Sequence, residues 1–254
     1  MLIPEIKAVL QKLLVEVQAL LGDHFTGLYL HGSLASGDFN PRRSDIDFLV
    51  VTTSELPVEL LPQLAIMHTR LAASGLPWAD KLEGSYIPQA ALRRYDPTHA
   101  HHPALRIDGS FAIDRHGHDW VIQRQVLRQQ GIILAGPPLQ DLIDPIQPED
   151  LRLAARATLN EWWAPMLDEP ARLRSREYQA YAAITMCRIL YTLCYGAVAT
   201  KSDAARWAQT ELGESWVGLI EQAMAWPEKP QPDRLEGTLA LIRFTVLLTH
   251  SEIH

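Results

Sequence analysis

Residues 28–51 read LYLHGSLASGDFNPRRSDIDFLVV. An apolar run that begins at Leu28 stops at Gly32-Ser33, where a helix can start. The chain then returns through a polar loop into the apolar residues 48–51, which favour a strand. The segment therefore predicts a strand, a glycine turn with a short helix, a loop and a second strand.

The loop ends in two acidic residues, Asp45 and Asp47, separated by Ile46. Alternate side chains of an extended segment share a face, so both carboxylates are expected on one face and Ile46 on the other. Neighbouring carboxylates repel each other unless a cation lies between them, and Mg²⁺ binds carboxylates together with water and phosphate oxygens. A turn such as Gly32-Ser33 lets the backbone approach a phosphate, and the N–H groups at a helix start favour an anion. We therefore predict a site for a nucleoside triphosphate and its metal.

The motifs His31-Gly32-Ser33 and Ser44-Asp45-Ile46-Asp47 resemble the signature of the nucleotidyltransferase superfamily. Within it, the chain looks most like the aminoglycoside (3″)(9) adenylyltransferases, which modify streptomycin and spectinomycin. The resemblance implies an enzyme that moves AMP from ATP to a hydroxyl group of a small molecule, with two Mg²⁺ ions. It also implies the fold, which is an α/β nucleotidyltransferase domain with a mixed, polymerase-beta-like sheet followed by an all-α helical bundle domain.

The length of 254 residues fits two modest domains, and a composition of 47% hydrophobic and 21% charged residues is that of a globular protein. The net charge of −7 argues against a nucleic-acid partner, which needs a basic face, and is compatible with a cationic substrate. No signal peptide or membrane span is evident, and the two cysteines are two helical turns apart, too far for a disulfide. A cytoplasmic protein is expected. The oligomeric state stays open, with a monomer slightly favoured.

Strand and helix patterns alternate as far as residue 147, which predicts an α/β domain over 1–147. From Pro148 onward the strand-like runs stop, and we expect an all-helical domain over 148–254 that supplies most of the acceptor pocket. The amphipathic helix expected before the first strand covers residues 4–21. Helices of the second domain are expected over 149–163, 176–198, 203–212, 215–225 and 233–250.

Residues 81–87 alternate as a strand, with Glu83 on the face opposite to Leu82 and Tyr86. Glu83 is the best candidate for a third carboxylate, because the acceptor hydroxyl must lose its proton to a base near the metal. The resemblance implies the same, since the adenylyltransferases carry such a glutamate in a similar context. We therefore expect Glu83 to act as base, to help hold metal and to contact the substrate. Asp80 is the fallback candidate for the base.

Residues 88–118 are the hardest to interpret. The histidines at 99, 101 and 102 favour a solvated loop rather than a metal site, since their spacing is not that of zinc ligands, and a strand is expected over 107–113. The resembled enzymes stack an aromatic residue from this region on the drug. Phe111 and Trp120 are both candidates for that place.

The run KSDAARWA, which begins at Lys201, matches the family context of a lysine that reaches the triphosphate. The resemblance therefore implies that Lys201 binds nucleotide together with Gly32, Ser33 and Ser44. The drug-selective acidic residue of the family would fall near Tyr178 and Tyr181, which are the expected substrate contacts here. Tryptophans 162, 163 and 207 are expected in the core.

The sequence leaves other functions open. The acceptor could be a protein, an RNA end or another small molecule, and the chain could be a non-catalytic nucleotide-binding module or part of a toxin–antitoxin pair. The acidic balance disfavours the RNA end, and the presence of Glu83 disfavours a pure binder.

Overall fold

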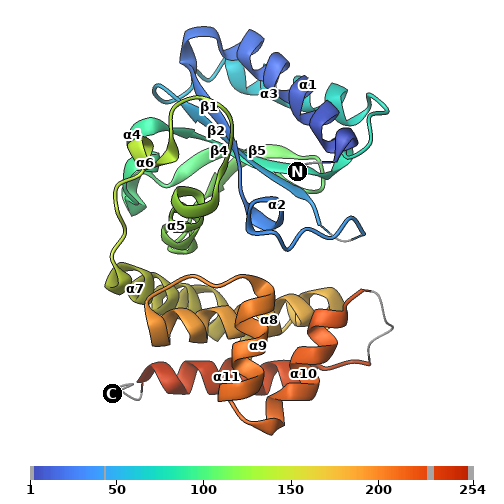
Figure 1. Ribbon diagram of the computed structural model, residues 1–254, viewed down its shortest axis with the longest axis vertical. Helices are drawn as coiled ribbons and strands as arrows, with labels where there is room; N and C mark the ends of the chain where they lie inside the picture. Colours follow the sequence, from blue (N-terminus) through green and yellow to red (C-terminus); the bar gives the residue numbers. More distant parts are fainter. Residues whose placement is uncertain (1–2, 43, 228–231, 251–254) are drawn as a thin grey trace. The chain divides into compact units, whose positions relative to one another are not determined.

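A computed structural model describes residues 3–42, 44–227 and 232–250. The chain divides into two compact units, Met1–Pro145 and Ile146–His254, and each is described by itself (Figure 1). No helix within the described ranges has the length and apolarity needed to cross a membrane.

The first unit is built on one six-stranded mixed sheet. Strands β2 and β3 run parallel, whereas the other neighbouring pairs with a described register run antiparallel. The strand order is β5-β4-β3-β2-β1-β6, with β1 Phe25–Leu30, β2 Ile46–Thr52, β3 Leu82–Pro88, β4 His101–Leu105, β5 Phe111–Arg115 and β6 Ile132–Ala135. This arrangement confirms the mixed sheet expected from the sequence.

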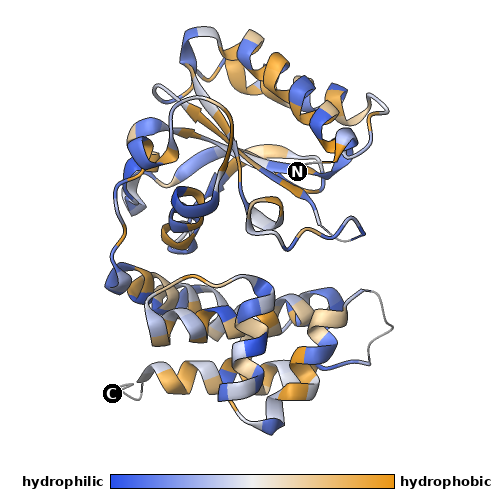
Figure 2. Cartoon of the chain, viewed as in Figure 1, coloured by the Kyte–Doolittle hydropathy of each residue, from blue (hydrophilic) through white to orange (hydrophobic). Residues whose placement is uncertain are grey.

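Helices α1 (Pro4–Leu21) and α3 (Leu60–Ala72) cover one face of the sheet (Figure 1). The apolar stripe of α1 packs on every second residue of the central strands, including Ile46, Phe48 and Tyr86, and forms the main core. Figure 2 shows the apolar strands and the apolar side of α1 within this unit. Because Ile46 faces this core, Asp47 faces the opposite side of the sheet.

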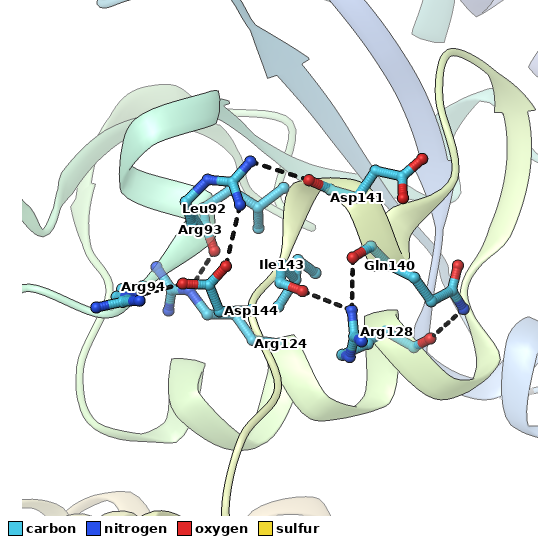
Figure 3. A network of polar contacts seen from close by, with 9 residues as sticks. All are labelled: Leu92, Arg93, Arg94, Arg124, Arg128, Gln140, Asp141, Ile143 and Asp144. Carbon is cyan, nitrogen blue, oxygen red and sulfur yellow. Dashed lines mark hydrogen bonds and ion pairs between the residues drawn. The ribbon is translucent and has the colours of Figure 1, made fainter.

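Helices α2 (Gly32–Ser36) and α5 (Asp119–Gln130) lie on that opposite side (Figure 1). Arginines fix α5 to its neighbours, α4 (Gln89–Arg93) and α6 (Leu139–Leu142). The buried Arg124 guanidinium donates to the carbonyls of Ala91 and Leu92 at 2.6 and 2.9 Å. Arg128 donates to the carbonyls of Gln140 and Ile143 at 2.7 and 2.6 Å (Figure 3). These bonds hold α5 firmly against the rest of the unit.

The strand expected over 107–113 is wrong in its first part and right for residues 111–113, which belong to β5. Residues 106–110 form the turn of a β4–β5 hairpin, in which the N–H of Arg106 donates to the carbonyl of Ser110 at 2.9 Å. The expectation of a solvated histidine loop is also wrong in part, because His102 on β4 and His116 after β5 are 1% and 3% exposed.

The second unit is all helical, as the sequence predicted. The side chain of Ser175 caps α8 by accepting from the N–H of Tyr178. The helix expected over 149–163 is divided, since α7 passes into a π-helical turn at Leu159–Trp163. The helices are α7 Pro148–Thr158, α8 Arg176–Tyr195, α9 Lys201–Glu211, α10 Glu214–Ala225 and α11 Leu235–His250.

Candidate active site

Three carboxylates meet at one edge of the parallel strand pair. Asp47 on β2 and Glu83 on β3 are direct partners in the register, and Asp45 immediately precedes β2. Each of the three offers a carboxylate oxygen, and these oxygens all lie within 4.8 Å of one another. The structure therefore brings together the acidic residues that the sequence singled out.

The electrostatics of this cluster are unfavourable without a cation. Burial, the charges of Asp45 and Asp47 and a hydrogen bond with Asp45 raise the pKa of Glu83 to about 7. Asp114 on β5 adds a smaller effect in the same direction. Oxygen-only donors with this excess of negative charge suit a hard divalent cation such as Mg²⁺.

Gly32 is packed directly against this cluster. Its φ is +62°, and a Cβ atom at this position would lie 1.8 Å from the Oδ2 atom of Asp47. The backbone N–H of the preceding His31 donates to the carbonyl of Asp47 at 3.1 Å. The Asp47 carboxylate therefore occupies space that only a glycine leaves free.

The two serines of the motifs have different environments. The hydroxyl of Ser33 is buried and has no hydrogen-bond partner among the described residues. The hydroxyl of Ser44 accepts from the N–H of Asn40 at 3.0 Å and so closes the loop before Asp45. An unsatisfied hydroxyl beside a carboxylate cluster fits a phosphate oxygen, so the residues present fit a metal-bound triphosphate.

The fallback base lies elsewhere. Asp80 is exposed on a short 3-10 helix, Ala79–Lys81, and is not one of the three clustered carboxylates. Sequence reasoning missed Asp114, which pairs with Arg106 at 2.9 Å between Nε and Oδ2. The turn signal Asp108-Gly109 could have revealed the hairpin that places Asp114 on the sheet.

The two aromatic candidates lie on opposite faces of the sheet. Phe111 stacks on His68, with ring centroids 5.7 Å apart, and belongs to the core under α1 and α3. Trp120 on α5 contacts the ring of His31 at 6.4 Å, beside Gly32. Of the two, only Trp120 is on the side of the carboxylates.

The remaining expected residues belong to the second unit. Lys201 is the first residue of α9 and is exposed. Tyr178 and Tyr181 on α8 contact each other with ring centroids 5.6 Å apart, and Tyr181 is 50% exposed.

The expectation that Trp162 is a core residue is wrong. Its side chain is 44% exposed and donates through Nε1 to the Tyr178 hydroxyl at 3.0 Å. The guanidinium of Arg172 lies over its ring at 4.7 Å. The neighbouring Trp163 is buried, as expected. Both tryptophans lie in the π-helical turn Leu159–Trp163, which the sequence did not predict.

Both halves of the chain match family models. Residues 10–86 match the nucleotidyltransferase domain, and residues 141–252 match the C-terminal domain of aminoglycoside adenylyltransferases. These matches confirm the resemblance that rested on the Gly-Ser and Asp-x-Asp motifs.

Curated relatives and a solved structure that resemble this chain are also adenylyltransferases. An aminoglycoside (3″)(9) adenylyltransferase of Escherichia coli is 25% identical over 245 residues, which are 92% of this chain and 89% of the relative. One from Klebsiella pneumoniae is 26% identical over 208 residues, 77% of this chain and 75% of the relative. A spectinomycin adenyltransferase from Enterococcus, solved with ATP and spectinomycin, superposes with a TM-score of 0.75 at 17% identity and covers 95% of this chain and 99% of its own. That likeness confirms the fold.

Proposed function

Because residues 10–86 match the nucleotidyltransferase domain and residues 141–252 match the C-terminal domain of aminoglycoside adenylyltransferases, we propose that the chain transfers AMP from ATP to a hydroxyl group of a small molecule. The proposed acceptor is an aminoglycoside such as spectinomycin or streptomycin. The observation that carries the proposal is that Asp45, Asp47 and Glu83 lie together beside Gly32. Gly32 begins the Gly32-Ser33 turn, which we call the phosphate turn.

Glu83 is the proposed base. The acceptor oxygen forms a bond to the α-phosphorus while the bond to the bridging α–β oxygen breaks, and pyrophosphate leaves with that electron pair. The carboxylate of Glu83 takes the hydroxyl proton. In the site without metal, burial and the neighbouring carboxylates raise the pKa of Glu83 to about 7, so its carboxylate accepts a proton more readily than an ordinary glutamate does.

Asp45 and Asp47 are the proposed metal ligands, with Glu83 completing the set. When bound, Mg²⁺ supplies positive charge that stabilises the entering and leaving oxygens. Gly32 lets the chain pass close to the phosphates, Ser33 offers its unsatisfied hydroxyl, and Ser44 holds the loop that carries Asp45.

We assign acceptor binding to residues 148–254. Lys201 is the proposed cation for the triphosphate, on the strength of its sequence context. Tyr178 and Tyr181 are the proposed acceptor contacts. The exposed aromatic cluster that they form with Trp162 supports this assignment, because ring faces and hydroxyls bind the rings of a sugar-like acceptor.

Pyrophosphate release from ATP and Mg²⁺ tests the proposal. We expect release only when an acceptor is added, in a panel of spectinomycin, streptomycin and unrelated aminoglycosides. Asp80→Asn removes a carboxylate that lies outside the cluster of Asp45, Asp47 and Glu83, and this control variant should release pyrophosphate at the wild-type rate. Absence of release with every acceptor, while Mg·ATP still binds, would refute the aminoglycoside assignment and leave the nucleotide site standing.

A further inference from the structure

A buried histidine forms an unusual contact behind the phosphate turn. The ring of His116 stacks on the indole of Trp120, with centroids 3.6 Å apart and planes inclined by 6°. The imidazole is 3% exposed, and its Nε2 atom lies 3.0 Å from the hydroxyl of Ser85, two residues beyond Glu83 on β3. The imidazole of His116, which follows the β4–β5 hairpin, therefore forms a flat surface on which the indole of Trp120 packs.

Trp120 in turn contacts the phosphate turn. Its ring meets that of His31 edge-on, at 6.4 Å and 64°, and His31 directly precedes Gly32. Helix α5, which carries Trp120, is anchored at Arg124 and Arg128 by bonds to backbone carbonyls (Figure 3). A continuous chain of contacts therefore runs from β3 to the start of α2.

The other support of the phosphate turn comes from β2, through the bond from the His31 N–H to the Asp47 carbonyl, and from the partly buried Leu34, which packs against the main core. Helix α2 has only five residues, Gly32–Ser36, and none of them is buried. On one side the Asp47 carboxylate fills the space beside Gly32. On the other side the ring of His31 is the buried group that joins the turn to a fixed element, and Trp120 is the residue it meets.

We propose that His116 is a positioning residue for nucleotide binding, which acts by stacking on Trp120 and so holds His31 and the Gly32-Ser33 turn in the conformation that receives the triphosphate. This inference rests on the proposed function, since it takes Gly32-Ser33 as the phosphate-binding turn. Among the described residues, His116 contacts Ser85, His102 and Trp120, none of which belongs to the carboxylate cluster, so it acts through Trp120 rather than on the substrate.

Two variants separate the stacking of His116 on Trp120 from its hydrogen bond with Ser85. His116→Gln keeps a polar partner for Ser85 and loses the stack. His116→Phe combined with Ser85→Ala keeps a flat ring and removes both partners of the hydrogen bond, which leaves no buried hydroxyl unsatisfied. We expect Mg·ATP to bind about three- to tenfold more weakly to the glutamine variant, as the loss of one aromatic pair predicts, and at the wild-type level to the double variant.

The control is His102→Gln. His102 is as deeply buried as His116 and its ring lies 4.8 Å from it, but no contact with Trp120 joins it to the turn. Calorimetric titration with Mg·ATP and thermal unfolding are measured on all variants. Lower thermal stability with unchanged Mg·ATP affinity is expected for His102→Gln.

Two results would overturn the inference. One is wild-type affinity in His116→Gln, and the other is an equal loss of affinity in His102→Gln. If the wild-type protein binds no Mg·ATP, the nucleotide site itself is refuted and the proposed function falls with it. Binding of Mg·ATP without transfer to any aminoglycoside would instead refute only the choice of acceptor.

Discussion

At the scale of single residues, the site depends on how closely Asp47 packs on Gly32. We predict that Gly32→Ala displaces the carboxylate and lowers Mg·ATP affinity at least tenfold, because the new Cβ would lie 1.8 Å from Oδ2. Gly37→Ala is the matched control. Gly37 has a φ of +81° and nothing within 4 Å of its Cβ position, so this variant should lose only about 1–2 kcal/mol of stability. Equal Mg·ATP affinity in the two variants would contradict the packing argument.

Glu83 should make the metal-free protein sensitive to pH. Its folded pKa of about 7 lies above the ordinary value of 4.5, so its favourable contribution to stability is complete below pH 4.5 and is lost as pH rises through 7. Glu83→Gln should therefore unfold at a higher temperature than wild type at pH 8 in EDTA, by about 2–4 °C for each kcal/mol of relieved repulsion. Near pH 4.5 the two proteins should converge. If the difference in melting temperature between Glu83→Gln and wild type were the same at every pH, the carboxylates would not repel each other.

Some site residues could be predicted from the sequence and others could not. Asp45, Asp47 and Glu83 follow from alternation in strands, because neighbouring strands bring equivalent positions together. Asp114 could not be found in this way, because the strand expected over 107–113 ended one residue before it and the pairing of that strand with β4 was not predicted. The exposure of Trp162 could not be found either, because adjacent tryptophans in a helical pattern give no sign of a π-helical turn.

At the scale of elements, helix α3 meets the sheet through a buried histidine. His68 lies between the rings of Phe48 and Phe111, and its Nε2 atom is 2.7 Å from the Tyr86 hydroxyl. Burial lowers the pKa of His68 to about 4, so the stability it contributes is present above 6.5 and is lost as pH falls towards 4.

Because His68 is buried between α3 and the sheet, we predict that acid destabilises the fold. At pH 5 the loss due to His68 should be about 2 kcal/mol, and His68→Gln should show a smaller drop in melting temperature between pH 7 and pH 5 than wild type. His101→Gln, at an exposed position on β4, should keep the wild-type drop. An unchanged drop in His68→Gln would mean that other groups cause the acid sensitivity.

The elements themselves were predicted unevenly. The helix over 4–21 was found because its apolar residues recur with helical spacing and glycine follows it. The β4–β5 hairpin was misread because Pro103 and a cluster of histidines interrupt the alternation. Tertiary contacts determine the structure there: His102 is buried against His116, and His116 is stacked on Trp120, which no local sequence pattern shows.

At the scale of the whole molecule, the change from alternating strands and helices to helices alone was visible in the sequence at Pro148. The chain divides into Met1–Pro145 and Ile146–His254; one family model lies within the first unit, and the other begins at residue 141, close to the division. The nature of the acceptor did not follow from the sequence. The residues that we propose as its contacts lie in a cluster formed by separate segments, in which Trp162 donates to the Tyr178 hydroxyl.

We propose that adenylyl transfer depends on Asp47 and its neighbouring carboxylates. The most direct test is the mass of the acceptor after incubation with ATP and Mg²⁺, measured for wild type, Asp47→Asn and Asp80→Asn. We predict an acceptor heavier by one AMP with wild type and Asp80→Asn, and a rate at least 10²-fold lower with Asp47→Asn, whose fold should persist. Product formed by Asp47→Asn at the wild-type rate would contradict the account.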